Sequence, residues 1–325
     1  MKDIVIGIDT SAYTTSLCAT NIDTYAIEFE RRKILDVPLG ERGLRQNTAV
    51  FQHLKNLPFF VEELFSEIDA NRIACIAVSD KPRPIIDSYM PVFFAGNTYA
   101  RVMSASLSIP LYTFSHQEGH IAVGIGTLPT KINSTRFLAI HISGGTSEVC
   151  LVKESEDKQY EIDLIGSSLD LHAGQFVDRV GVKMGLSFPA GKELELLGQQ
   201  CTTKLAIPSS VRGLNFSFSG PATNAERLLD EGFNHADVSR AVENCIAKTL
   251  EKIIIIAKKE YNIADVLIVG GVAANSTIRE YLTSRLAHRT VDIKTHYAKK
   301  EYSSDNSYGT SLLGIYKHIS CNYGN

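Results

Sequence analysis

Short runs of apolar and β-branched residues alternate along this chain with longer stretches in which apolar residues recur at helical spacing. Unbroken apolar runs bounded by polar or glycine positions are typical of buried strands. They predict strands over residues 3–9, 16–21, 75–80, 137–143, 148–154 and 266–271. Helical spacing predicts long helices over residues 48–68 and 236–261. The alternation favours an α/β fold with crossover helices over parallel or mixed sheets.

Three details refine these predictions. Pro58 lies inside the first helical pattern and predicts a kink or a break there. Asp237 and Ser239 stand near the start of the second pattern and are candidate helix caps. The polar stretch "PTKINSTR" (residues 129–136) precedes the strand predicted from residue 137 and predicts a link between two lobes.

Two strand–turn–strand segments share one form. "VIGIDTSAYTTSLCA" near the start and "LAIHISGGTSEVCLV" in the middle both place a small polar turn between apolar strands. Such turns offer backbone N–H groups and hydroxyls to phosphate oxygens, although a single one is more often an ordinary hairpin. A third segment, "VLIVGGVAANSTIREYL", runs from a strand through Gly270 and Gly271 to Asn275, where a helix N-terminus is predicted. The repeated hairpin favours two related lobes.

The stretch "FSHQEGHIAVGI" places His116 and His120 four residues apart. On a helix, residues at i and i+4 share a face, so both imidazoles can reach one ion while Glu118 points elsewhere. Such a pair, taken alone, is more often structural than metal-binding. The spacing therefore marks a candidate metal site that needs support from the rest of the chain.

Composition narrows the class of protein. The chain has 325 residues, enough for one large domain or two medium ones, and a formal net charge of -3. Overall charge therefore indicates no nucleic-acid partner, and any such partner needs a local patch. Lys81, Arg83 and residues 294–302 are candidates for that patch, although such a run is more often a solvated surface. With no signal peptide, membrane span or Cys-x-x-Cys pair, we expect a cytoplasmic protein with reduced thiols.

The order of the three turns is similar to that of the acetate kinase, sugar kinase and actin superfamily, and no Walker motif occurs. Within that superfamily, "SHQEGH" resembles the H-x-E-G-H motif of the TsaD family, the tRNA threonylcarbamoyladenosine transferases once classed as O-sialoglycoprotein endopeptidases. Further segments resemble motifs of the family, in order, along nearly the whole chain: "GIDTS", "HISGGTSEV", "LDLHAGQFVDRVGVKMGLSFPAG", "NFSFSG", "IVGGVAAN" and "YSSDN". The resemblance implies an α/β, two-lobed, duplicated actin-like fold. The implied lobes are residues 1–135 and 136–304, with residues 305–325 packing back on the first.

The resemblance also implies an activity and a site. The family transfers a threonylcarbamoyl group from threonylcarbamoyl adenylate to the adenosine beside the tRNA anticodon (t6A biosynthesis), assisted by small partner proteins that include an inactive homologue and an ATPase. It implies one iron or zinc ion on His116, His120 and Asp305, with His141 as a candidate fourth ligand. The implied nucleotide and substrate contacts are Asp9, His141, Ile142, Ser143, Gly144, Gly145, Asp178, Gly191, Gly270, Gly271 and Asn275.

Several positions depart from the family pattern. Tyr13 and Thr14 stand where the family has an acidic pair, and "DLHAGQ" has Leu171 and Gln175 in place of acids. The loop before the histidine pair is "DKPRPIIDSYM" instead of a small-residue G-P-G loop, and Ser307 replaces a glycine. These changes favour a divergent paralogue, so a non-catalytic or regulatory nucleotide and metal binder is an open alternative.

The older classification of the family raises a third hypothesis, a metallopeptidase. A zincin helix places its glutamate directly after the first histidine, where the carboxylate acts on the metal-bound water. That position is Gln117 here, and an amide cannot serve as a general base. The sequence therefore disfavours peptidase chemistry.

Overall fold

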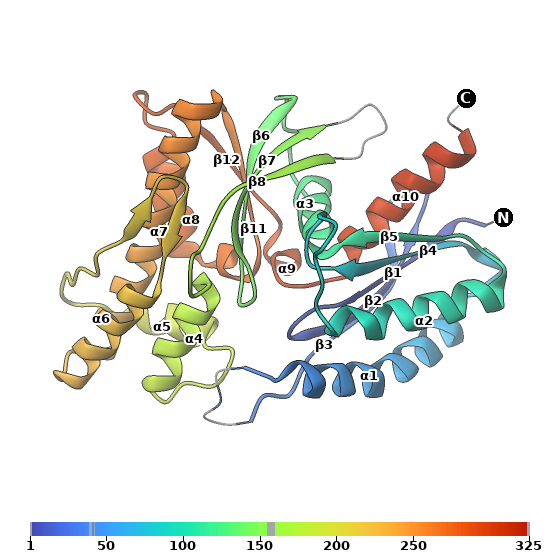
Figure 1. Ribbon diagram of the computed structural model, residues 1–325, viewed down its shortest axis with the longest axis horizontal. Helices are drawn as coiled ribbons and strands as arrows, with labels where there is room; N and C mark the ends of the chain where they lie inside the picture. Colours follow the sequence, from blue (N-terminus) through green and yellow to red (C-terminus); the bar gives the residue numbers. More distant parts are fainter. Residues whose placement is uncertain (1, 39–40, 42, 155–159, 324–325) are drawn as a thin grey trace.

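The computed structural model describes residues 2–38, 41, 43–154 and 160–323 and folds them into two lobes, each built on a five-stranded sheet (Figure 1). The strand order is β3-β2-β1-β4-β5 in the first lobe and β12-β11-β6-β7-β8 in the second. In each sheet three consecutive strands form an antiparallel meander, and two later strands add in parallel beside the first of them. The lobes share one topology, as the repeated hairpin predicts.

The bounds of the elements follow. The first sheet contains β1 (Ile4–Thr10), β2 (Thr14–Asn21), β3 (Ile27–Ile34), β4 (Ile73–Lys81) and β5 (Leu111–Ser115), and the second contains β6 (Arg136–Ile142), β7 (Ser147–Glu154), β8 (Tyr160–Ser167), β11 (Asp265–Val269) and β12 (Lys294–Tyr297). A short ribbon is formed by β9 (Ser210–Arg212) and β10 (Asn215–Ser217). The α-helices are α1 (Gln46–Glu67), α2 (Val92–Leu107), α3 (His116–Gly126), α4 (Ala173–Lys183), α5 (Gly191–Gly198), α6 (Ser219–Asp230), α7 (His235–Tyr261), α8 (Ser276–Leu286), α9 (Lys300–Ser303) and α10 (Tyr308–Tyr323), and single 3-10 turns are η1 (Ala70–Arg72) and η2 (Gly271–Ala274).

The first sheet is covered on both faces. Successive side chains of a strand point to opposite faces, so Ile4, Ile6 and Ile8 of β1 enter the core beneath α1 and α2, and Val5 enters the core beneath α10 (Figure 1). Gly7 lies under α10, where a Cβ would stand 2.4 Å from the Ser307 carbonyl oxygen. The glycine therefore lets α10, the last helix of the chain, pack directly on the first strand.

Helix α3 lies between the lobes. Its residues Ala122 and Val123 join the core beneath α10, while Ile121 joins a core with Leu267 and Val269 of β11. The opposite face of the second sheet packs on α4, α6, α7 and α8. A helix held by both sheets carries the histidine pair, so the fold places those side chains at the junction of the lobes.

The predicted strands and helices all occur, with ends shifted by at most two residues or so. A kink or a break was predicted at Pro58; the break is wrong, because α1 runs through Pro58 as one helix. Leu54, whose carbonyl loses its helical partner to the proline, lies on the exposed side of α1, where that carbonyl can reach water. The predicted caps of α7 are also wrong: Asn234 caps this helix, and Asp237 accepts from the backbone N–H groups of Thr202 and Thr203.

The chain passes between the lobes twice, through residues 127–135 and again through the segment between β12 and α10. All six cysteines are free thiols, and four of them are buried. Within the described part of the chain, no helix is both long enough and apolar enough to cross a bilayer.

Candidate functional site

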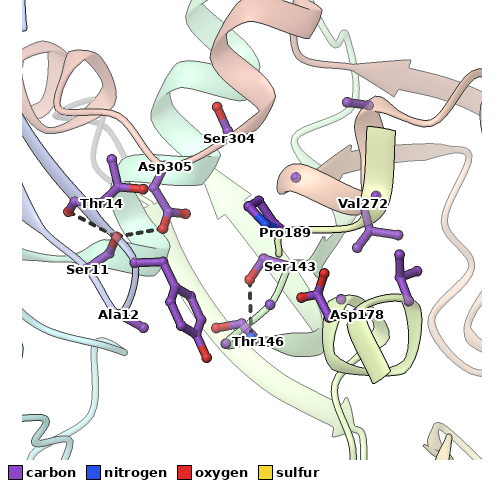
Figure 2. Close-up of a pocket in the computed structure, with 18 of the residues that line it drawn as sticks. Ser11, Ala12, Thr14, Ser143, Thr146, Asp178, Pro189, Val272, Ser304 and Asp305 are labelled. Carbon is purple, nitrogen blue, oxygen red and sulfur yellow. Dashed lines mark hydrogen bonds between the residues drawn. The ribbon is translucent and has the colours of Figure 1, made fainter. Parts of the chain in front are cut away.

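A cavity of about 740 Å³ opens between the two lobes (Figure 2). The first lobe contributes the β1–β2 turn, and the second contributes the β6–β7 turn, the start of α5 and the turn after β11. Of the residues implied by resemblance, those that line the cavity are His116, Ser143, Gly144, Gly145, Asp178, Gly191, Gly271, Asn275 and Asp305. His120, His141, Ile142, Asp9 and Gly270 are absent from that lining and lie behind it.

Two similar turns face each other across this cavity (Figure 2). In the β1–β2 turn, the Ser11 N–H donates to the Thr14 carbonyl at 3.1 Å. In the β6–β7 turn, the Ser143 N–H donates to the Thr146 carbonyl at 2.7 Å, and the Thr146 N–H donates to the Ser143 hydroxyl at 3.1 Å. Both turns are tight and hydroxyl-lined, a form that suits phosphate oxygens.

Three candidate ligands converge at the lobe junction. His116 Nε2 and His120 Nε2 lie 3.1 Å apart, and Asp305 Oδ1 lies 3.2 Å from His120 Nε2 and 3.5 Å from His116 Nε2. Ligand atoms of all three residues fall within 4.8 Å of one another. The helix explains the pair, because α3 begins at His116 and presents positions i and i+4 on one face. Two imidazoles and one carboxylate form a donor set that divalent transition metals accept.

The neighbouring residues orient these ligands. Asp9 Oδ1 lies 2.8 Å from His116 Nδ1, so the carboxylate holds the proton on that nitrogen and leaves Nε2 directed at the cluster. Although burial opposes it, the carboxylates of Asp9 and Asp305 raise the pKa of His116 to about 10. The Ser11 hydroxyl donates to Asp305 Oδ2 at 2.6 Å, which ties the β1–β2 turn to the same cluster (Figure 2). Asp9 therefore contacts a histidine and does not reach the nucleotide part of the cavity.

Several buried polar atoms at this junction lack a hydrogen-bond partner within the described part of the chain. Both ring nitrogens of His141, Nδ1 of His120 and Oδ2 of Asp9 are buried without a hydrogen-bond partner among the described residues. Burial, reinforced by His120 and His116, lowers the pKa of His141 well below its ordinary value, so its ring is neutral with a free lone pair. Its ring centroid lies 4.1 Å from that of His120. Buried polar atoms normally have partners, and a bound metal ion satisfies such atoms.

Glu118 and Gln117 are both occupied elsewhere. Glu118 completes a capping box with Ser115 at the start of α3. It therefore points away from the histidine pair, as predicted. The Gln117 amide donates to the Glu148 carboxylate at 2.5 Å and to Cys150 Sγ at 3.2 Å. Neither side chain can therefore act as a base beside the histidine pair.

The second half of the cavity has the features of a nucleotide pocket. Asn275 caps α8 by accepting from the Ile278 N–H at 3.0 Å, and its amide donates to Glu243 Oε1 at 2.7 Å. Gly270 has φ +99°, and a Cβ there would lie 2.3 Å from the Ile142 carbonyl oxygen. At Gly271 a Cβ would meet nothing within 4 Å. Gly270 is thus required by the fold, whereas Gly271 keeps the cavity open.

Asp178 is a buried carboxylate at this pocket. It is 6% exposed and accepts from the Ala190 N–H at 2.8 Å. Burial raises the pKa of Asp178 to about 6, against an ordinary value of 3.8. A helix residue in "FVDRV" would ordinarily be solvated, so its burial beside a cavity is consistent with a ligand-binding role.

Replacing Asp178 by asparagine is expected to stabilise the protein at neutral pH. The folded state holds the Asp178 proton to higher pH than the unfolded state, so this group favours folding below pH 4, and that contribution is lost as pH rises through about 6. A shift of about two pKa units corresponds to about 3 kcal/mol. In urea unfolding, the free energy of unfolding of Asp178→Asn relative to the wild type should rise by roughly that amount as the pH is raised from 4 to 7. An equal pH dependence in both proteins would contradict the assignment.

An ion pair joins the lobes at the edge of the cavity. Arg83, in the loop after β4, contacts the Glu148 carboxylate of β7 at 2.5 Å. Glu148 is only 2% exposed, and burial raises its pKa despite this arginine. The basic residue predicted as a phosphate contact therefore balances a buried acid in the other lobe.

Replacing Arg83 by methionine is expected to lower the free energy of unfolding by roughly 1–3 kcal/mol, because it leaves the Glu148 carboxylate buried with only the Gln117 amide as partner. The control is Arg31→Met. Arg31 pairs with Glu63 on the surface, where the expected loss is below about 1 kcal/mol. Equal losses in urea unfolding of the two variants would show that the Arg83 pair is no more than a surface contact.

The family model described as tRNA N6-adenosine threonylcarbamoyltransferase (TsaD) matches residues 41–311. Proteins named tRNA N6-adenosine threonylcarbamoyltransferase from Archaeoglobus fulgidus and from a Sulfurihydrogenibium species are 27% and 30% identical to this chain; the alignments cover 97% and 96% of it and 92% and 89% of the relatives. A glucokinase of the ROK family from Streptomyces griseus, solved with glucose and AMPPNP, aligns over 95% of this chain and 98% of its own with a TM-score of 0.53 at 10% identity. The last match concerns the fold alone and confirms the two-lobed α/β architecture of the sugar kinases.

Proposed function

Because this chain belongs to the tRNA N6-adenosine threonylcarbamoyltransferase family, we propose that it transfers the threonylcarbamoyl group of threonylcarbamoyl adenylate to the adenosine beside the tRNA anticodon. One observation carries the proposal at the level of the site. The candidate metal ligands His116 and Asp305 line the same cavity as Gly271 and Asn275. An acyl adenylate has an acyl end and an adenosine end, and it spans a cavity of this kind.

The reaction is an acyl transfer. The N6 nitrogen of the acceptor adenosine forms a bond to the carbamoyl carbon, the bond from that carbon to the phosphate oxygen breaks, AMP leaves, and the amine loses one proton. The chain's contribution is to hold donor and acceptor together and to stabilise the negative charge that develops. The Ser143 and Thr146 N–H groups are used within their own turn, so the N–H groups of Gly144 and Gly145 are the donors that we assign to the phosphate. Asp178 and Asn275 are assigned to the adenosine end.

We assign one divalent transition metal, iron or zinc, to His116, His120 and Asp305, with His141 as the fourth ligand. The unpartnered nitrogens of His141 support it as the fourth ligand, since burial keeps this imidazole neutral and a neutral imidazole is the ligand form of histidine. When bound, such an ion supplies Lewis-acid polarisation of the carbamoyl oxygen. Asp9 positions His116 through Nδ1, and Ser11 positions Asp305.

Peptidase activity is the weaker hypothesis. Gln117 follows the first histidine and is hydrogen-bonded to Glu148 and Cys150, and Glu118 is held by the cap of α3. No carboxylate is therefore free to activate a metal-bound water from this helix. The alternative of a non-catalytic or regulatory paralogue rests on Tyr13, Leu171 and Gln175, which stand where the family pattern has acids.

We infer that tRNA is the acceptor and that small partner proteins of the t6A pathway, an inactive homologue and an ATPase among them, assist as in the family. Lys192 and Lys300 line the cavity, and we assign them to contacts with the phosphate backbone of the acceptor. Lys300 donates to the Ser276 hydroxyl at 2.8 Å, so part of the predicted basic stretch already lies at the site.

The test is release of AMP from threonylcarbamoyl adenylate, measured with and without unmodified tRNA and in the presence of the family's partner proteins. We expect release that depends on tRNA and on His116. Nucleotide binding without tRNA-dependent release, whatever the partners, would favour the regulatory paralogue. Cleavage of casein that is abolished by His116→Ala would favour the peptidase.

A further inference from the structure

Tyr13 reaches from the first lobe onto the second inside the cavity. Its ring centroid lies 5.2 Å from that of Phe188, and a Cβ built on Gly144 would lie 3.4 Å from the Tyr13 ring. The ring thus packs on the β6–β7 turn and beside Pro189, although Tyr13 itself belongs to the β1–β2 turn. Tyr13 is therefore placed at the point where the two candidate phosphate turns face each other.

The phenol hydroxyl is a donor without an acceptor. A Cβ built on Gly43 would lie 2.7 Å from the Tyr13 hydroxyl oxygen, so this end of the ring lies against the segment before α1. No hydrogen bond joins the hydroxyl to the described residues, while its neighbours in the β1–β2 turn, Ser11 and Thr14, are bonded to each other. Burial, followed by the carboxylates of Asp178 and Asp305, raises the pKa of Tyr13 above its ordinary value. The hydroxyl therefore keeps its proton. Tyr13, Asp178 and Asp305 all line the same cavity.

We propose that the Tyr13 hydroxyl donates a hydrogen bond to a phosphate oxygen of the bound nucleotide and so positions the acyl phosphate between the two turns. The inference rests on the nucleotide site of the proposed function and names a further contact in it. A phosphate oxygen is an acceptor of the right charge, since hydrogen bonds to charged groups are the stronger ones.

The choice of phosphate over base or ribose follows from position. The residues assigned to the adenosine end, Asp178 and Asn275, belong to α4 and to the start of α8 in the second lobe. Tyr13 instead contacts Gly144, in the middle of the β6–β7 turn whose N–H groups are assigned to the phosphate. Loss of the hydroxyl should therefore lower the affinity for a phosphorylated ligand and leave the affinity for the nucleoside unchanged.

The experiment compares binding of adenosine, AMP and ATP to the full chain by calorimetry. Tyr13→Phe keeps the ring and removes only the hydroxyl. It should lower the affinity for AMP and ATP about tenfold and change the affinity for adenosine less than twofold. Tyr13→Asp also removes the hydroxyl, so it should lower the affinity for AMP at least as much. Tyr99→Phe is the matched control, because Tyr99 packs on the core of the first lobe away from the cavity and should leave all three affinities unchanged.

Equal AMP affinity in wild type and Tyr13→Phe would overturn the proposal. An equal loss for adenosine and AMP would overturn it too, because it would assign Tyr13 to ring packing only. These readouts do not depend on transfer to tRNA. A wild type that binds AMP through Tyr13 but modifies no tRNA would refute the proposed function and leave this inference standing.

Discussion

Replacing His116 and His120 together by alanine is expected to remove the bound transition metal and to reduce threonylcarbamoyl transfer to background. The two imidazoles supply two of the three side chains that converge at the lobe junction, so the variant keeps only Asp305 and the proposed fourth ligand His141 of the assigned set. Loss of a residue that merely orients a metal ligand typically costs 10–100-fold in affinity, and the loss of two ligands costs more. Elemental analysis should find about one metal ion per wild-type chain and less than about a tenth of that in the variant.

The matched control replaces two exposed histidines, His235 and His288, by alanine. It removes the same number of imidazoles from the surface and should retain both metal and activity. The proposed site is wrong if wild type, control and His116/His120 variant hold equal metal. Circular dichroism of the variant checks that α3, which is capped by Ser115 and Glu118 and not by the histidines, is intact.

Valine at Gly270 and valine at Gly271 are expected to fail in different ways. At Gly270 the backbone has φ +99°, and a Cβ would lie 2.3 Å from the Ile142 carbonyl oxygen and 2.8 Å from His141 Cδ2. We expect Gly270→Val to lower the free energy of unfolding by more than about 3 kcal/mol. At Gly271 a Cβ meets nothing, so Gly271→Val should fold normally and fill the cavity. Its AMP affinity should fall roughly tenfold or more.

For both variants, urea unfolding measures the free energy of unfolding and calorimetry measures the affinity for AMP. A folded Gly271→Val protein with wild-type AMP affinity would contradict the nucleotide pocket at this turn. A stable Gly270→Val protein would contradict the close approach of the β11 turn to β6. Because the two residues are adjacent, each variant controls for the general effect of adding a branched side chain to this turn.

The strands that could be predicted are those buried on both faces. β1, β4, β6 and β11 are unbroken apolar runs, and their apolar side chains are buried on both faces of the sheets. β3, β5, β8 and β12 were not predicted. Each lies at the edge of its sheet, and β3, β8 and β12 also carry exposed charged residues, such as Lys33 and Glu161. The three-residue strands β9 and β10 were missed as well. The N-cap of α7 was misplaced because the Asp237 carboxylate accepts from the distant Thr202 N–H and does not cap its own helix.

For the site, local spacing was informative and long-range pairing was not. The pair His116 and His120 could be read from spacing, because both lie on one helix face. Asp305 is far away in the sequence and came only from resemblance to a family. Glu243 beside Asn275 and the ion pair of Arg83 with Glu148 were missed, since charged residues in separate elements give no local signal. Tyr13 was seen only as the loss of an acid, whereas the structure shows a ring packed on the opposite lobe.

The most direct test uses threonylcarbamoyl adenylate labelled with ¹³C at the carbamoyl carbon. The metal-loaded protein, with its partner proteins, is incubated with this donor and unmodified tRNA, and the digested nucleosides are analysed by mass spectrometry. The account predicts labelled threonylcarbamoyladenosine at the position beside the anticodon with the wild type, and none with the variant lacking His116 and His120. Label that remains in the donor or in its hydrolysis products, with no labelled nucleoside in the wild-type reaction, would contradict it.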